Sequence, residues 1–382
     1  MNDRERFTAT LKFQKTDRPF RWETVAVWPS AIKKWHEQGL PANINCNDIT
    51  NSEFYSHYGM DKIGWLPFPG VWTVNPYCPY FEFKILNDDG EHLTIQDYDG
   101  IIKMNLKKDA DTSMPSFLEF PVKSKKDYYE KIKWRLDYKT PERFPSDWQE
   151  YVKSNITRDF PMGMFVTGPF GHLRNLYGDE NLMYEFFDEP DFIHEIMTDW
   201  MNFNIGFITK VCKDFVPDFI MIWEDICYKS GPLVSPDIYK EFMLPYLKKV
   251  ITCAKLAGIV GIILDTDGDC SKMIPLYLES GVNAFYPFEV QAGMDIVQLR
   301  KEYGNAFTII GGLDKTTLAI SEEAVMAELD KKLPFMLEKG GYIPMLDHSV
   351  PTNVTLKMFQ FYIDYIRKLE AKYGDFTKRK EY

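Results

Sequence analysis

The sequence predicts an α/β fold, a (β/α)8 barrel with an antiparallel β insertion early in the chain. In the second half, apolar runs of about six to eight residues alternate with longer amphipathic segments. These runs are apolar throughout, which is typical of parallel strands buried on both faces under an outer layer of helices. We find no GxGxxG motif after a predicted strand, which disfavours the runner-up, an open doubly wound sheet.

Six strand–helix units are visible in the second half of the sequence. Each apolar run is followed by a segment with helical periodicity, which predicts a parallel sheet with helices outside. A seventh strand is predicted at "RWETVAVW" (21–28), and one strand of the first half is poorly marked. No clear linker divides the chain, so we expect residues 1–382 to form a single domain. The six predicted strands are 162–168, 218–225, 258–265, 284–289, 307–314 and 341–347.

The first half of the sequence has a different pattern, that of antiparallel strands. The stretch "YFEFKILNDDGEHLTIQDYDGIIKMNL" (80–106) alternates like a β-meander, with Asp-Gly turns at 89–90 and 99–100. We expect residues 70–130 to form a β insertion on the rim of the barrel. Residues 34–59 read as helix, loop and helix.

Composition narrows the possible partners. With 45 basic and 56 acidic residues, the formal net charge is −11, which argues against nucleic acid as a partner. No apolar run approaches the ~18 residues of a membrane span, and the first residues lack a signal core. The six cysteines form no CxxC pair. We therefore expect a cytoplasmic protein with reduced thiols and no membrane partner.

Acidic residues follow successive predicted strands at their carboxyl ends, the face on which β/α barrels carry their active sites. The stretch "IILDTDGDC" (262–270) is the clearest case. A solvated loop with helix caps is the plain alternative, and we interpret Asp314, Asp295 and Asp269 in that way. The remaining residues at strand ends are Glu224, Asp225, Asp265, Asp267, Glu289, Asp347 and His348.

Asp265 and Asp267 are two residues apart, so on an extended strand both side chains point the same way. Converging carboxylates need a metal ion, a cationic substrate or shared protons. Together with Glu289 and His348 they form an oxygen-rich set with one imidazole. Such a set suits zinc, manganese, iron or magnesium.

Several long motifs resemble the uroporphyrinogen decarboxylase superfamily. They are "WEDICYKSGPLVSPDIYKEFMLPYLKKVI", "DTDGDCSKMIPLYLESGVNAFYPFEVQAGMD", "GGYIPMLDHSVPTNVTLKMFQFYIDYIRK", "GPFGHLR" and the opening "NDRERFTATLKFQKTDRP". The resemblance covers nearly the whole chain outside residues 70–130. It implies a (β/α)8 barrel, which agrees with the periodicity.

At two places the sequence departs from the motifs of this superfamily. Decarboxylases of this superfamily carry an arginine-rich "MRQAGR" type of signature that clamps substrate carboxylates, whereas this chain has "FRWETVAVWPSAIKKW". Corrinoid-dependent methyltransferases of the superfamily hold zinc with a His-x-Cys pair and a later Cys. Those positions correspond here to Asp265, Asp267 and His348, so the resemblance implies a metal site with harder ligands, with zinc the first expectation. No Asp-x-His-x-x-Gly motif occurs, so any cobalamin would arrive on a separate corrinoid protein.

We therefore expect a metal-dependent methyltransferase or demethylase that acts on a small molecule and uses a corrinoid protein or a thiol as its methyl partner. The expected catalytic residues are Glu224, Asp225, Asp267 and His348. The expected substrate-binding residues are His172, Arg174, Trp223, Tyr286 and Glu289. Two alternatives stay open, namely a uroporphyrinogen decarboxylase-like lyase and a non-catalytic small-molecule-binding barrel. A homodimer is compatible with the sequence.

Overall fold

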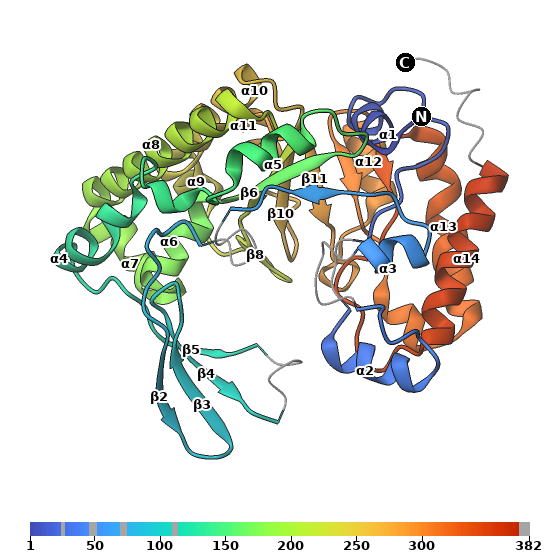
Figure 1. Cartoon of the computed structure of the whole chain (residues 1–382), viewed down its shortest axis with the longest axis horizontal. Coiled ribbons are helices and arrows are strands. Elements are labelled where there is room, and N and C mark those ends of the chain that lie inside the picture. Colours follow the sequence, from blue (N-terminus) through green and yellow to red (C-terminus); the bar gives the residue numbers. More distant parts are fainter. Residues whose placement is uncertain (24–26, 46–51, 69–74, 109–113, 374–382) are drawn as a thin grey trace.

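A parallel β-sheet of seven strands forms the centre of the protein (Figure 1). The computed structural model describes residues 1–23, 27–45, 52–68, 75–108 and 114–373. The strand order is β1-β6-β7-β10-β11-β12-β13, and every neighbouring pair is parallel. The strands are β1 (Gly64–Trp65), β6 (Met162–Thr167), β7 (Phe219–Trp223), β10 (Gly261–Thr266), β11 (Ala284–Pro287), β12 (Thr308–Ile310) and β13 (Tyr342–Ile343).

All six strands predicted in the second half are present, and their apolar side chains are buried except for the half-buried Phe165 and Trp223. The predicted helical segments follow them in the expected order, which confirms the α/β class. These helices are α6 (Pro169–Tyr177), α7 (Asp179–Asp188), α8 (Pro190–Asp214), α9 (Pro236–Phe242), α10 (Leu244–Leu256), α11 (Ile274–Ser280), α12 (Ile296–Tyr303), η6 (Lys315–Ala319), α13 (Glu322–Lys339) and α14 (Leu356–Tyr373).

Helix α1 (Asp3–Leu11) packs against the amino ends of the sheet strands. The ring of Phe7 lies 5.1 Å from that of Phe219 at the start of β7, and Arg4 Nε donates to Asp218 at 2.7 Å. The amino ends are thereby filled by apolar and ion-pair contacts. The carboxyl ends, where the predicted acids lie, remain for a functional site.

The structure shows seven strands of a curled sheet and does not show the full eight-stranded barrel that the sequence predicts. Val27 forms a parallel bridge with Val350, and Glu23 accepts a hydrogen bond from the Leu346 amide, both beyond β13. Glu23 and Val27, from the predicted strand 21–28, therefore lie beside the segment that follows β13. Residues 24–26, which decide whether this strand closes the sheet onto β1, lie outside the described residues.

The insertion is a separate antiparallel sheet of four strands, as predicted. Its strands are β2 (Lys84–Asp88), β3 (His92–Gln96), β4 (Ile102–Leu106) and β5 (Ser116–Glu119). Gly90 and Gly100 sit in the two predicted turns with φ of 90° and 83°, which is the reason for glycine there. Figure 1 shows this sheet projecting from the helical body below α7.

The other described elements are short, and several follow the insertion in the chain. They are α2 (Pro29–Glu37), α3 (Ser52–His57), α4 (Lys125–Asp127), η2 (Tyr128–Ile132), η3 (Lys133–Leu136), η4 (Pro141–Arg143), α5 (Trp148–Asn155), β8 (Cys227–Tyr228), β9 (Gly231–Pro232) and η5 (Val290–Ala292). The pair α2 and α3 matches the predicted helix, loop and helix. Among the described residues, no helix is long and apolar enough to cross a membrane.

Candidate active site at the carboxyl ends of the parallel strands

Three predicted site residues lie level with one another on neighbouring strands. Asp265 of β10 pairs in register with Trp223 of β7 on one side and with Tyr286 of β11 on the other. Paired residues of parallel strands project to the same face of a sheet. Their side chains therefore share one face near the carboxyl ends.

Beyond this row, Asp267, Glu289 and His348 form a three-residue cluster. One ligand-type atom from each residue lies within 4.8 Å of the others, and all three side chains are half-buried. The closest recorded approach is 3.5 Å, between His348 Nε2 and Asp267 Oδ2. Three strands, β10, β11 and β13, thus each supply one donor from the segment after the strand ends.

The backbone turn at Gly268 builds this cluster. Gly268 has φ of 77°, and its N–H donates to Glu289 Oε2 at 2.9 Å. A Cβ at this position would lie 2.7 Å from backbone atoms of Cys227, so only glycine fits the turn. The turn holds Glu289 beside Asp267.

This arrangement changes the expected metal set. The strand period predicts Asp265 beside Asp267, but β10 ends at Thr266 and the chain leaves strand geometry there. The three-residue cluster contains Glu289, which we expected both in the oxygen-rich set and in substrate binding, and it does not contain Asp265.

Asp225 and Asp265 form a second acidic group next to Asp267. Asp225 accepts hydrogen bonds from the backbone N–H of Asp267 and from the Trp223 side chain. Burial and the charge of Asp267 raise the pKa of Asp225 to about 6, although Arg174 opposes the rise. Burial and the charges of Asp225 and Asp267 raise the pKa of Asp265 well above its usual value. In this group the close carboxylates and their burial therefore favour the protonated form of the acids.

Arg174 joins this acidic group, as expected for a residue near the site. Its Nη1 donates to the Asp225 carbonyl at 3.0 Å, and Nη2 lies 3.6 Å from the Asp225 carboxylate. Its guanidinium carbon is 5.0 Å from the centre of the Trp223 ring. Asp225 itself has φ of 45°, a strained conformation of the kind that gathers at functional sites.

His348 is held from both sides of its ring. The Ser349 N–H donates to Nδ1 at 2.7 Å, so the proton of the neutral ring lies on Nε2, facing Asp267. Burial lowers the pKa of His348, but the hydrogen bond and charge of Asp267 outweigh it and raise that pKa above the usual value. Next to it, buried Asp347 accepts the N–H groups of Val290 and Lys315 and so ties three loops together.

The cluster fits a divalent metal in donor type and number. Two carboxylates and one imidazole are ligands that zinc accepts, and three protein ligands leave one position open. Bonds of about 2.0–2.2 Å place tetrahedral ligand atoms about 3.3–3.6 Å apart, which matches the Asp267–His348 separation. Ligation by His348 Nε2 requires its proton to leave or move to Nδ1, which would break the Ser349 contact.

Glu224 does not join the exposed acids. It has no exposed surface, and its carboxyl group lies under the amino end of α6, where it accepts from the Phe170 amide at 3.1 Å and from the Tyr277 hydroxyl at 3.2 Å. A Cβ on Gly168 would lie 1.9 Å from Glu224 Oε2. Burial raises the pKa of Glu224 to about 8. The contacts describe a buried packing residue, and its expected catalytic role has no geometric support.

His172 is also buried away from the cluster. It is 1% exposed, its nearest recorded aromatic neighbour is Tyr77 at 6.5 Å between ring centres, and burial lowers its pKa to about 3. Its Nε2 has no hydrogen-bond partner among the described residues. His172 and Arg174 are two positions apart on α6, so their side chains leave the helix on different sides.

The acids interpreted as caps have cap contacts. Asp295 accepts from the amides of Val297 and Gln298, and Asp314 accepts from the Thr316 amide. The strain at Phe288, with φ of 63° just before Glu289, was not predicted. No local sequence signal marks it, because phenylalanine rarely adopts this conformation.

Known proteins resemble this chain in sequence and in fold. The family model described as uroporphyrinogen decarboxylase (URO-D) matches residues 104–369, more than half of the chain. A uroporphyrinogen decarboxylase of Chloroherpeton thalassium is 24% identical, over a match that covers 49% of this chain and 52% of the relative. A uroporphyrinogen decarboxylase of Chlorobium limicola is 26% identical, over a match that covers 37% of this chain and 40% of the relative. The chain thus spans about half the length, or less, of these curated relatives.

A solved structure described as a methyltransferase from Methanosarcina mazei superposes with a TM-score of 0.61. The two sequences are 12% identical, and the superposition covers 96% of this chain and 99% of the methyltransferase chain. At this identity the likeness concerns the fold alone. The family match, the relatives and the fold lead to one statement: this chain belongs to the uroporphyrinogen decarboxylase (URO-D) family.

Proposed function

We propose that this protein is a metal-dependent methyltransferase or demethylase that acts on a small molecule. The observation that carries the proposal is the cluster of Asp267, Glu289 and His348 at the carboxyl ends of the parallel strands. A bound divalent ion would act there as a Lewis acid, which lowers the pKa of a thiol or water. Zinc is the first candidate because of the mixed carboxylate and imidazole donors.

The neighbouring acids would supply the proton chemistry. When a methyl group leaves oxygen or nitrogen as an electrophile, the bonding electrons stay on that atom, which then takes up a proton. Burial and the neighbouring carboxylates raise the pKa of both Asp265 and Asp225, which favours a protonated acid as the proton donor. Arg174 holds Asp225 and lies over Trp223, which keeps this wall of the site in place.

Substrate contacts follow from the row of paired residues. Trp223 and Tyr286 flank Asp265 on the same face, so a small substrate would lie between two aromatic side chains and an acid. The methyl partner is a thiol or a separate corrinoid protein, and we expect no cobalamin bound by this chain. The proposal takes residues 21–28 as the eighth strand of a closed barrel, supported by the bridge between Val27 and Val350. A cytoplasmic location and a homodimer belong to the same proposal.

Decarboxylation is the second candidate. The family description and the curated relatives favour it, and the acidic group suits a substrate that becomes cationic on protonation. Against it, Arg21, the arginine of the segment corresponding to the substrate clamp, forms an ion pair with Glu370 through Nη2 at 2.7 Å. An arginine engaged in this way is not available as a carboxylate clamp.

A methyl-transfer assay separates these candidates. Zinc-loaded protein is mixed anaerobically with free methylcobalamin and 2-mercaptoethanol, and loss of the methylcobalamin spectrum is followed. The methyl group passes to the thiolate sulfur and the bonding electrons stay on cobalt, giving cob(I)alamin. We expect the wild-type protein to accelerate the reaction, His348→Ala to abolish the acceleration, and Asp237→Asn, at a side chain 91% exposed on α9, to leave it unchanged. A rate equal to that without protein contradicts transfer to a thiol.

A further inference from the structure

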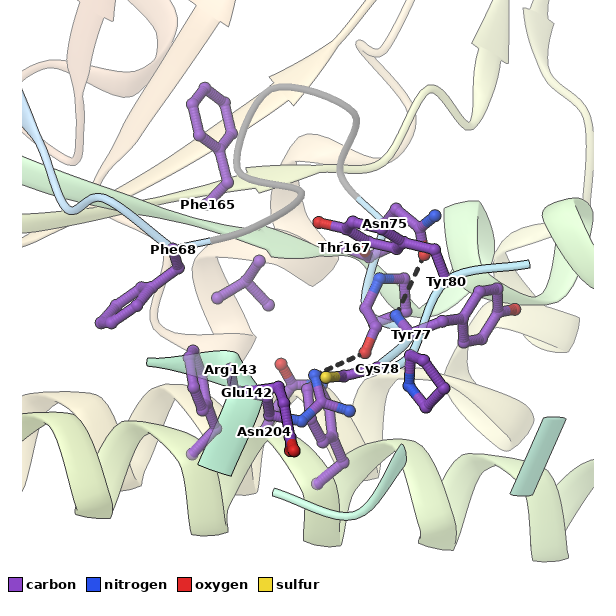
Figure 2. A pocket seen from close by; sticks show the side chains of 15 residues that line it. Phe68, Asn75, Tyr77, Cys78, Tyr80, Glu142, Arg143, Phe165, Thr167 and Asn204 are labelled. Atoms are coloured by element: carbon purple, nitrogen blue, oxygen red, sulfur yellow. Dashed lines mark hydrogen bonds between the residues drawn. The ribbon is translucent and has the colours of Figure 1, made fainter. Parts of the chain in front are cut away.

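A cavity of about 300 Å³ lies beside the carboxyl-terminal half of β6, between that strand, α8, η4 and the segment around residues 75–80 (Figure 2). This volume is at the lower end of the range for small-molecule sites. Its lining contains none of Asp267, Glu289 and His348, so it is a different place from the acidic cluster. It nevertheless lies at the same end of the sheet, because Thr167 in its wall pairs in register with Trp223.

Aromatic side chains dominate the wall of this cavity. They are Phe68, Tyr77, Tyr80, Phe165, Phe203 and Phe207. The rings of Phe203 and Phe207 are nearly parallel with centres 5.8 Å apart, and Phe68 meets Phe207 edge-on at 5.0 Å. A wall of this kind favours a planar apolar ligand that can stack on it.

One cation, Arg143, lies in this aromatic wall, where Figure 2 shows it beside Cys78. Arg143 is 6% exposed, and its guanidinium carbon is 4.6 Å from the centre of the Phe203 ring. Its Nε donates to the Asp137 carbonyl at 2.8 Å, Nη1 to the Pro76 carbonyl at 2.7 Å, and Nη2 to the Arg135 carbonyl.

These contacts position Arg143 without neutralising it. All three hydrogen-bond partners recorded among the described residues are backbone carbonyls, which carry only partial negative charge. The charge of Asp137 acts on Arg143 and Glu142 lines the same cavity, but neither carboxylate forms an ion pair with Arg143 among the described residues, and burial lowers the pKa of Arg143. The guanidinium has five N–H bonds, so donor capacity remains for an anion.

We infer that this cavity binds an aromatic carboxylate, with Arg143 holding the carboxylate and the phenylalanine and tyrosine rings holding the aromatic body. The carboxylate supplies the missing counter-charge, and its two oxygens match the planar donor fork of arginine. A neutral ligand of the same shape fills the aromatic wall but leaves the cation uncompensated. The inference concerns binding alone and does not depend on the proposed methyl transfer.

Benzoate and its neutral isostere benzamide test the inference on the wild-type protein. Calorimetric titration should show benzoate binding about tenfold or more tightly than benzamide, because a charge-assisted hydrogen bond replaces a neutral one. Cys78 lines the cavity and is half-buried, so benzoate should slow its alkylation by iodoacetamide. Cys212 and Cys253, half-buried thiols between α8 and α10, serve as internal controls whose labelling should not change.

Two variants complete the test. Arg143→Met should lose the preference for benzoate over benzamide, whereas Lys126→Met, which removes an exposed cation on α4 outside the cavity lining, should keep it. If Arg143→Met does not fold, the comparison of benzoate and benzamide binding to the wild-type protein still tests the inference. Equal binding of benzoate and benzamide overturns the inference, as does benzoate binding that leaves the labelling rate of Cys78 unchanged.

Discussion

His348 Nε2 lies 3.5 Å from Asp267 Oδ2, across the carboxyl ends of the central strands. Asp267 follows β10 and His348 follows β13, while Glu289 follows β11 between them in the sheet order. No local sequence pattern links these three residues, so their meeting is a product of the fold. The proximity of one imidazole and two carboxylates is the basis of the proposed metal site.

Replacing Glu289 tests which acid completes the site. We expect Glu289→Gln to weaken zinc binding about tenfold or more, because it removes a carboxylate that would bind the metal directly. Asp265→Asn should weaken zinc binding much less, because Asp265 is not part of the three-residue cluster. Equilibrium dialysis of both variants with zinc measures this. A larger loss in Asp265→Asn than in Glu289→Gln would restore the ligand set expected from the strand period.

Buried Glu23 makes stability depend on pH. Burial raises its pKa in the folded protein to about 8, from an ordinary value of 4.5. The stability that protonated Glu23 contributes to the folded protein is therefore fully present below about pH 4.5. It is lost as pH rises towards 8, and the free energy of unfolding then falls by at most about 1.4 kcal/mol per pH unit. Glu23→Gln has no such proton to lose, so its melting temperature should fall less than that of the wild type between pH 5 and 8.

Glu338→Gln is the matched control for this prediction, because Glu338 is exposed. Its melting profile should run parallel to that of the wild type from pH 5 to 8. Identical profiles for Glu23→Gln and wild type would show that Glu23 ionises normally in the folded protein.

Uroporphyrinogen should not be a substrate. The segment that corresponds to the arginine clamp contains Arg21, which pairs with Glu370 through both Nε and Nη2. Anaerobic incubation with uroporphyrinogen and chromatography of the oxidised porphyrins measures turnover. Accumulation of coproporphyrinogen would contradict the prediction and favour the decarboxylase.

Gly168→Ala should destabilise the protein by about 1–3 kcal/mol or more. Gly168 has φ of −65°, so alanine is allowed by the backbone, but the new Cβ would lie 1.9 Å from Glu224 Oε2 and 2.8 Å from the Trp223 carbonyl. Urea denaturation measures the change in unfolding free energy. Unchanged stability would mean that Glu224 does not occupy the space under α6.

Much of the fold is predictable because a strand buried on both faces is apolar along its whole length. Six such strands stand out in the sequence, whereas β1, with only Gly64 and Trp65, is too short to give a pattern. The family resemblance and the periodicity agree because both depend on these buried strands.

The candidate site is only partly predictable. Glu224 and Asp225 are adjacent and look alike in sequence, but the positive φ at Asp225 sends one carboxyl under α6 and the other towards Asp267. The same limit applies to Asp265 and Asp267, because the strand period ends at Thr266. Arg143 gave no sequence signal, since its partners are the backbone carbonyls of Pro76, Arg135 and Asp137, which any residue type supplies.

The most direct test of the proposed function is a calorimetric zinc titration of the wild-type protein and of Asp267→Asn, in two buffers with different ionisation enthalpies. We predict about one zinc ion per wild-type chain, proton release on binding because His348 must lose its Nε2 proton, and strongly weakened binding in Asp267→Asn. Asp237→Asn, which removes an exposed carboxylate on α9, should bind like the wild type. Absence of zinc binding by the wild type, or equal binding by Asp267→Asn, would contradict a metal centre formed by Asp267, Glu289 and His348.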